Sequence, residues 1–122
     1  SRRTGEKAEK AIMEALKDIP SHTFLWGEKK ENPIMGFYAC ADIIIATGDS
    51  VSMCCEACGT GHPVLLYKGI GWLPKKHTRF VNSLIEQGYA QDITSTDALN
   101  FKPGKTLNPS IQIAEKILQT LK

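Results

Sequence analysis

The sequence contains no hydrophobic run long enough to cross a membrane. Its longest apolar stretch, residues 37–46, is interrupted by Asp42 and has about half the length that a bilayer-spanning helix needs. Neither sign of charge is in large excess, because 15 Lys and Arg residues oppose 13 Asp and Glu residues and leave a formal net charge of +2. This balance excludes a general nucleic-acid binder and a polybasic membrane-surface protein, so any phosphate site must be local.

Glycine, proline and cysteine are each too scarce to indicate a collagen-like, disordered or disulfide-rich protein. Ten Gly and six Pro residues among 122, with 42% apolar and 23% charged residues, exclude collagen-like and fully disordered chains. Three of the four cysteines fall within five residues, a spacing unsuited to a disulfide framework. We therefore expect one globular domain spanning residues 1–122, in a reducing, cytoplasmic compartment.

The amino-terminal residues include neither an initiator Met nor a hydrophobic signal core. This pattern predicts that the chain is a fragment of a larger protein, cut so that targeting information is removed.

Hydrophobic periodicity predicts alternating helices and strands. Apolar residues three and four apart indicate helices, and Asn-Pro pairs at Asn32 and Asn108 mark an N-cap followed by a first-turn proline. Continuous apolar runs bounded by glycine indicate buried strands. The expected helices are residues 5–18, 33–41, 51–58, 74–87 and one that opens at Pro109; the expected strands are residues 23–26, 43–47, 64–67 and, at an edge, 91–93.

These elements predict an α/β fold. The strands at residues 23–26, 43–47 and 64–67 are expected to run parallel with helices on both faces, giving a three-layer Rossmann-like domain with a mainly parallel sheet. Thr4 is the expected N-cap of the first helix. The last helix is expected to bury its apolar face, formed by Ile113, Ala114, Ile117, Leu118 and Leu121.

The most informative segment is the turn Gly48-Asp49-Ser50, which joins the strand at residues 43–47 to the helix at 51–58. In open α/β sheets, ligands bind at the carboxyl ends of parallel strands. A helix N-terminus there offers unpaired backbone N–H groups and a favourable dipole for an anion. The segment therefore predicts a phosphate site.

Side chains of the following helix extend this candidate site. The hydroxyls of Ser50 and Ser52 would add donors, and Glu56 shares the exposed face of Ser52 one turn later. Glu56 is one position too late for a capping box, so its carboxylate is free to accept bonds from sugar hydroxyls. The alternative is that the serines only cap the helix and Glu56 is solvated. Asp49 is interpreted as a turn and N-cap residue, with a catalytic base as the alternative.

Two further groups of residues have competing interpretations. The cysteines of the helix at 51–58 are interpreted as small buried hydrophobes, although Cys55 and Cys58 with Cys40 and His62 also match a redox or zinc site. The cations Lys75, Lys76, His77 and Arg79 crowd a helix start, where the dipole disfavours them. They would meet a phosphate or sugar acid, and a solvated basic face fits equally well.

The resemblance of the chain to a known family rests on specific residues. The core motif is Asp49-Ser50-Val51-Ser52-Met53 with Glu56-Ala57 and Thr60-Gly61, supported by Ser1-Arg2-Arg3-Thr4, Glu31-Asn32-Pro33, Gly36 and Arg79-Phe80. On these residues the chain resembles the mitochondrial fission family named for the plant elongated-mitochondria phenotype. Bacterial members are commonly labelled predicted nucleoside-diphosphate-sugar epimerases. The chain departs from the family pattern with Gly5 in place of Pro and His62 in place of Lys.

The family in turn looks like the carboxyl-terminal half of the two-domain (GT-B type) glycosyltransferase fold. There, a Ser and a Glu on one helix hold the diphosphate and ribose of a nucleotide sugar. The resemblance implies that Ser50 or Ser52 binds phosphate and Glu56 binds hydroxyls. The full candidate site, for which no metal or separate cofactor is expected, is Gly48, Asp49, Ser50, Ser52, Glu56 and Arg79.

The same resemblance implies that the first central strand precedes Ser1, so the sheet is expected to be incomplete or to be completed by a second copy through an exposed edge. The amino-terminal domain that would supply an acceptor site is also missing, so the chain alone is expected to be inactive. The intact protein would be a glycosyltransferase-like or epimerase-like enzyme. The alternative is a non-catalytic scaffold or membrane-dynamics factor that retains the fold, as the plant members' role in organelle division suggests.

Overall fold

A computed structural model describes residues 2–121, and the chain divides after Phe37 into two compact units. None of its described helices is both long and apolar enough to cross a membrane. In chain order the elements are α1 (Glu6–Leu16), α2 (Ile34–Cys40), β1 (Ile44–Thr47), α3 (Val51–Cys58), β2 (Val64–Tyr67), α4 (Lys75–Glu86), β3 (Gln91–Asp92), the 3-10 helix η1 (Ala98–Asn100) and α5 (Pro109–Leu121).

The first unit contains α1, whose start differs from the prediction. Gly5, not Thr4, occupies the N-cap position, with φ +80° and no side-chain cap hydrogen bond. Glycine adopts this backbone conformation without steric cost, so the chain can turn into the helix there. The carbonyl oxygen of Gly5 accepts the first helical bond, 3.1 Å from the nitrogen of Glu9.

The strand predicted at residues 23–26 is wrong. These residues form coil and the start of a turn. The backbone N–H of Leu25 donates to Oε1 of Glu28 at 2.8 Å, and the N–H of Glu28 is 3.3 Å from the carbonyl oxygen of Leu25. A strand needs a neighbouring backbone to pair with, and this segment satisfies its polar groups locally instead.

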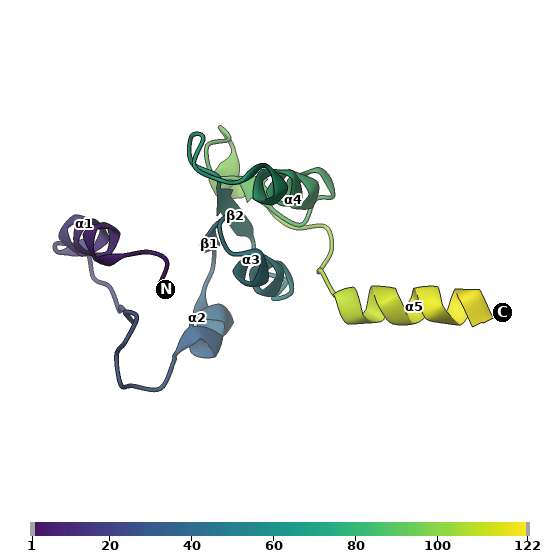
Figure 1. Ribbon diagram of the computed structural model, residues 1–122, viewed down its shortest axis with the longest axis horizontal. Coiled ribbons are helices and arrows are strands. Elements are labelled where there is room, and N and C mark those ends of the chain that lie inside the picture. Colours follow the sequence, from purple (N-terminus) through teal and green to yellow (C-terminus); the bar gives the residue numbers. More distant parts are fainter. Residues whose placement is uncertain (1, 122) are drawn as a thin grey trace. The chain divides into compact units, whose positions relative to one another are not determined.

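The second unit contains an all-parallel sheet in the order β1-β2-β3. Ile44 pairs with Val64 and Leu65 with Gln91, so β2 is the central strand. In Figure 1, α3 and α4 connect successive strands, and the two helices contact each other. The α/β, Rossmann-like class predicted from the sequence is confirmed, including the short edge strand at β3.

The two faces of this sheet differ. Right-handed crossovers through α3 and α4 place both helices on one face. There Ile44 and Ala46 are buried, whereas Ile45, between them, is 60% exposed. The opposite face has a groove of about 450 Å³, lined partly by η1. Within the described part of the second unit, this face therefore carries the short 3-10 helix η1 and not a second layer of long α-helices.

The start of α5 is as predicted, but its burial is not. Oδ1 of Asn108 accepts from the N–H of Ile111 at 3.1 Å, which confirms Asn108 as the cap. No described residue of α5 is buried, so the predicted core role of Ile113, Ala114, Ile117, Leu118 and Leu121 is wrong. Helical spacing identifies an apolar face but does not supply a surface to cover it.

Candidate functional site

The turn between β1 and α3 is built around Gly48 at the carboxyl edge of the sheet. Its N–H donates to the carbonyl oxygen of Tyr67 at 2.9 Å, which extends the pairing of β1 and β2. A Cβ atom at this position would lie 2.8 Å from Cδ1 of Leu73 and 2.9 Å from Cγ2 of Val81. Glycine is required by this close approach, and the turn is packed against the loop before α4 and α4 itself.

Ser50 caps the N-terminus of α3. The capping role considered as the alternative for the serines is thereby confirmed for Ser50, and the N-cap interpretation of Asp49 is wrong. Oγ of Ser50 accepts from the N–H of Met53 at 3.3 Å, and its own O–H remains able to donate. In the first turn of a helix, the N–H groups of Val51 and Ser52 have no intrahelical acceptor. The candidate site therefore offers two backbone donors and two hydroxyls to an anion.

Ser52 and Glu56 both lie on the exposed face of α3, one helical turn apart, as predicted. The structure adds Tyr38 to this face. Burial raises the pKa of the Tyr38 hydroxyl, and the charge of Glu56 and a hydrogen bond to it raise it further. The same hydroxyl is 4.0 Å from Sδ of Met53. Tyr38 comes from α2, so sequence spacing on α3 contained no signal for its approach to Glu56.

Asp49 is half-buried beside this turn. Its carboxylate lies close enough to Cys54 to influence that thiol: burial raises the pKa of Cys54 to about 11, with further contributions from Cys55 and Asp49. Sγ of Cys54 is also 3.6 Å from the carbonyl oxygen of Thr47. Asp49 therefore borders both the candidate anion site and the packed side of α3.

The cysteines of α3 behave largely as core residues. Cys54 and Cys58 are buried and Cys55 is half-buried, whereas Cys40 in α2 is exposed. Burial raises the pKa of Cys58 to about 12, which suppresses its nucleophilic thiolate form. Across residues 2–121, the structure brings together no group of three His, Cys, Asp or Glu side chains that could hold a metal ion.

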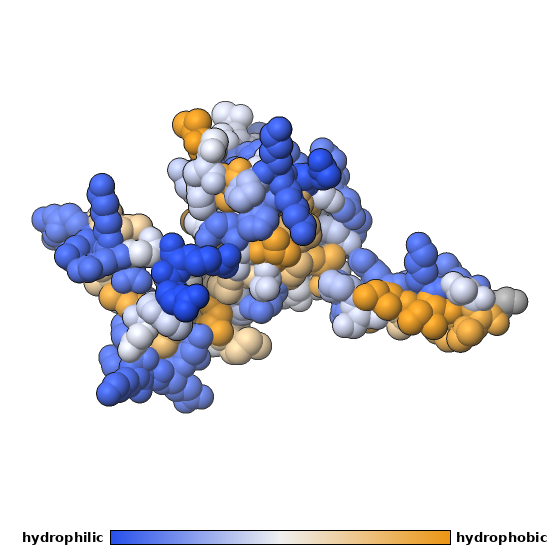
Figure 2. All heavy atoms as spheres, in the orientation of Figure 1, coloured by the Kyte–Doolittle hydropathy of each residue, from blue (hydrophilic) through white to orange (hydrophobic). Residues whose placement is uncertain are grey.

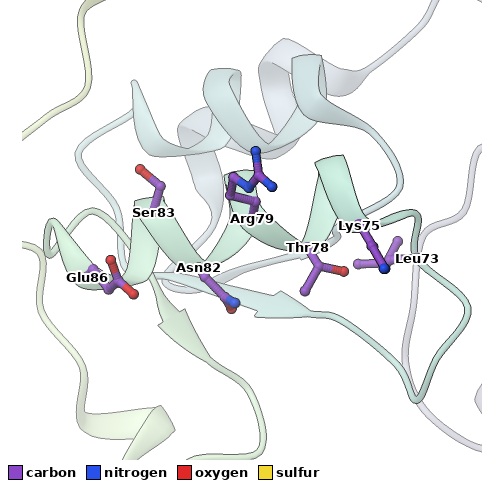
Figure 3. A pocket seen from close by; sticks show the side chains of 7 residues that line it. All are labelled: Leu73, Lys75, Thr78, Arg79, Asn82, Ser83 and Glu86. Carbon is purple, nitrogen blue, oxygen red and sulfur yellow. The ribbon is translucent and has the colours of Figure 1, made fainter.

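Arg79 lies on the exposed face of α4. Lys75 is one turn before it, and neither cation has an ion-pair partner among the residues that the structure describes. Both line a groove of about 440 Å³ on α4 (Figure 3). The groove begins at Leu73, the side chain that also packs against Gly48, so Arg79 is linked to the turn through Leu73.

Lys68 is a residue of this edge that the sequence reasoning missed. Its Nζ is 3.0 Å from Oδ2 of Asp92 and 3.1 Å from Oδ1 of Asn82. The hydroxyl of Thr94 donates to Asp92 at 2.6 Å and is the main cause of the lowered pKa of that carboxyl. Lys68 directly follows the predicted strand at residues 64–67, so its position at the carboxyl edge was inferable, but its partners were not.

Comparison with known proteins extends this description. A family model described as "Mitochondrial fission ELM1" matches residues 1–121. The chain belongs to the mitochondrial fission ELM1 family. The family resemblance inferred from the motif around Ser50 and Glu56 is thereby confirmed.

Two relatives show how much of an ELM1-family protein the chain represents. It is 32% identical over 125 residues to "Mitochondrial fission protein ELM1" of Arabidopsis thaliana, which covers 99% of this chain and 28% of the relative. It is 36% identical over 95 residues to "Uncharacterized protein RP120" of Rickettsia prowazekii (strain Madrid E), covering 75% of the chain and 26% of the relative. The chain thus spans little more than a quarter of either protein, and no solved structure matches it significantly.

Proposed function

We propose that the N-terminus of α3 binds the diphosphate of a nucleoside-diphosphate sugar. The observation that carries the proposal is the Gly48 turn, which delivers a capped helix N-terminus to the carboxyl edge of a parallel sheet. The N–H groups of Val51 and Ser52 would donate to phosphate oxygens, with the positive end of the helix dipole favouring the anion. The hydroxyls of Ser50 and Ser52 would complete the set of donors.

The sugar-binding side of this site is assigned to Glu56. Its exposed carboxylate, one turn after Ser52, is placed to accept hydrogen bonds from ribose or sugar hydroxyls. Asp49 borders the turn, and Arg79 would contribute positive charge from the far side of Leu73. The proposed ligand requires no metal, because the backbone N–H groups at the helix N-terminus and the guanidinium group of Arg79 would balance the negative charge of the diphosphate.

The proposed reaction needs more protein than this chain. A glycosyltransferase-like or epimerase-like activity requires an acceptor or catalytic surface, which the remaining length of the relatives would supply. The chain by itself is expected to bind the donor without turning it over. A cytoplasmic location belongs to the same proposal, because the four cysteines are free thiols, as in a reducing compartment.

The test is a calorimetric titration of uridine and guanosine diphosphates, and of their sugars, into the chain. Glu56→Ala is expected to weaken nucleotide-sugar binding by about 1.5 to 3 kcal/mol, because a charge-assisted hydrogen bond is lost. Its thermal midpoint should barely change, since Glu56 is exposed. Glu115→Ala, an equivalent loss of an exposed carboxylate on α5, is the matched control and should leave binding unchanged.

A non-catalytic role in membrane or organelle dynamics is the second candidate. It rests on the name of the Arabidopsis relative, a mitochondrial fission protein, which implies no sugar chemistry. On this alternative the fold is retained as a scaffold. Absence of nucleotide binding by the unmodified chain at millimolar ligand would favour it, and equal affinities of the unmodified chain and Glu56→Ala would remove Glu56 from the site.

A further inference from the structure

The apolar face of α5 is uncovered along the helix. Five aliphatic side chains, which we call the α5 stripe, are 54% to 78% exposed: Ile111, Ile113, Ile117, Leu118 and Leu121. Figure 2 shows a continuous hydrophobic band along one side of this helix. A 13-residue helix with no covered apolar face is only marginally stable in water, so the α5 stripe requires a partner surface.

The spacing of the apolar residues indicates what kind of surface can cover them. Ile111, Ala114, Leu118 and Leu121 follow one another at intervals of three, four and three residues. This is the a/d spacing at which two helices pack knobs into holes. The small side chain of Ala114 allows a second helix to approach closely at the middle of the face. A second α5 presents the same four residues at the same spacing, and we call this row the seam. Two copies of the helix can therefore pack against each other without a specially shaped groove.

The charges of α5 favour a second copy over a lipid surface. Within residues 109–121 the ionisable side chains are Glu115 and Lys116, one of each sign. Helices that lie on membranes carry a polar face rich in Lys and Arg, which this helix lacks. Two neutral copies can meet without net repulsion.

The area of the α5 stripe is sufficient for a weak, specific dimer. The exposed fractions of its five side chains correspond to roughly 600 Å² per copy, so complete burial of the stripe on two copies would exceed the ~1,000 Å² expected of a biological interface. A symmetric pair buries the same patch on both partners, so one helix is enough to close the assembly. We propose that the α5 stripe is the interface through which two copies of this chain form a symmetric dimer.

The test is sedimentation equilibrium of the 122-residue chain across a wide range of concentrations, with far-UV circular dichroism on the same samples. The unmodified chain is expected to dimerise, and its helicity to rise with concentration as α5 becomes covered. Leu118→Lys places a charge in the seam and is expected to weaken dimerisation at least ~100-fold. Gln119→Lys, on the polar side of the helix, is the matched control, because either lysine can pair with Glu115 along the helix.

Leu118→Ala provides a milder variant that keeps the helix propensity high, and it should weaken the dimer about tenfold. The proposal is overturned if the unmodified chain stays monomeric at every concentration. It is equally overturned if the dimer persists in Leu118→Lys, or if Gln119→Lys dissociates it as strongly. None of these outcomes depends on nucleotide binding. The dimer proposal can therefore fail while the proposed nucleotide-sugar site stands, and the reverse is also true.

Discussion

The ammonium nitrogen of Lys68 lies 3.0 Å from a carboxylate oxygen of Asp92, which joins the carboxyl end of β2 to β3. The same nitrogen is 3.1 Å from the side-chain oxygen of Asn82 in α4. One cation therefore ties two strands and a helix at the edge of the sheet where the candidate site lies. Both partners of the ion pair are about three-quarters buried, so water screens it less than a surface pair.

Replacing Lys68 with Met should lower the free energy of unfolding by about 0.5 to 1.5 kcal/mol, because Asp92 and Asn82 lose their shared donor. Urea unfolding at pH 7 measures the change. Lys10→Met is the matched control: it removes a 2.9 Å ion pair with Glu6 whose side chains are 76% and 82% exposed, and it should change stability by far less. Equal effects of the two variants would show that the Lys68 contact contributes nothing specific.

Acid should weaken the same edge. The pKa of Asp92 is held below its ordinary value, first by the hydroxyl of Thr94 and then by Lys68. A depressed folded-state pKa contributes stability that is present above the ordinary value of 3.8 and is lost as pH falls through the folded value. Asp92→Asn should therefore flatten the loss of stability between pH 4 and pH 2, measured as urea midpoints against pH. An unchanged slope would contradict the assignment.

Gly48→Ala should destabilise the chain by about 1 to 3 kcal/mol, since the new methyl group would crowd Leu73 and Val81. Gly36→Ala is its control, because a Cβ at this position in α2 meets no atom within 4 Å. That substitution should be neutral or stabilising by up to ~1 kcal/mol through higher helix propensity. Thermal unfolding of both variants measures the difference, and a Gly48→Ala protein as stable as the unmodified chain would show that the turn is not tightly packed.

Alkaline pH should destabilise the second unit through its buried thiols. The pKa values of Cys54 and Cys58 rise from 9.0 to about 11 and about 12, mainly because of burial. A raised folded-state pKa contributes stability that is complete below pH 9 and is lost as pH rises through 11 to 12. Thermal midpoints from pH 7 to pH 11 should fall accordingly.

Maleimide labelling followed by mass spectrometry should modify the exposed Cys40 first. Simultaneous labelling of all four cysteines would contradict the burial of α3.

Tyr38→Phe separates packing from hydrogen bonding at the candidate site. The ring stays in the core, while the hydroxyl that bonds to Glu56 is lost. The expected result is a change in stability below ~1 kcal/mol together with a several-fold loss of nucleotide-sugar affinity, because the carboxylate is no longer oriented. Tyr89→Phe, which removes a buried tyrosine's bond to Gln112, is the control and should leave affinity unchanged. A loss of affinity in both variants would point to a general structural effect.

Much of the local structure could be predicted from the sequence because neighbouring residues contain its causes. The bounds of α3 at Val51 and Cys58 agree with the prediction, since Ser50 caps its start and Gly59 follows its end. The strands at Ile44–Thr47 and Val64–Tyr67 follow from continuous apolar runs between turns. The exposed positions of Ser52 and Glu56 follow from the helical period.

Burial and pairing were decided only by the tertiary structure. The stripe of α5 has an amphipathic pattern, but no described surface of the second unit covers it. Residues 23–26 have the composition of a strand but no partner backbone. The approach of Tyr38 to Glu56 and of Lys68 to Asp92 joins segments that are far apart in the chain. The sequence alone determined the dihedral preferences, the caps and the apolar faces, because these depend on residues within a turn or two. Only the folded chain decided which surfaces and charges meet, because that depends on groups contributed by distant elements.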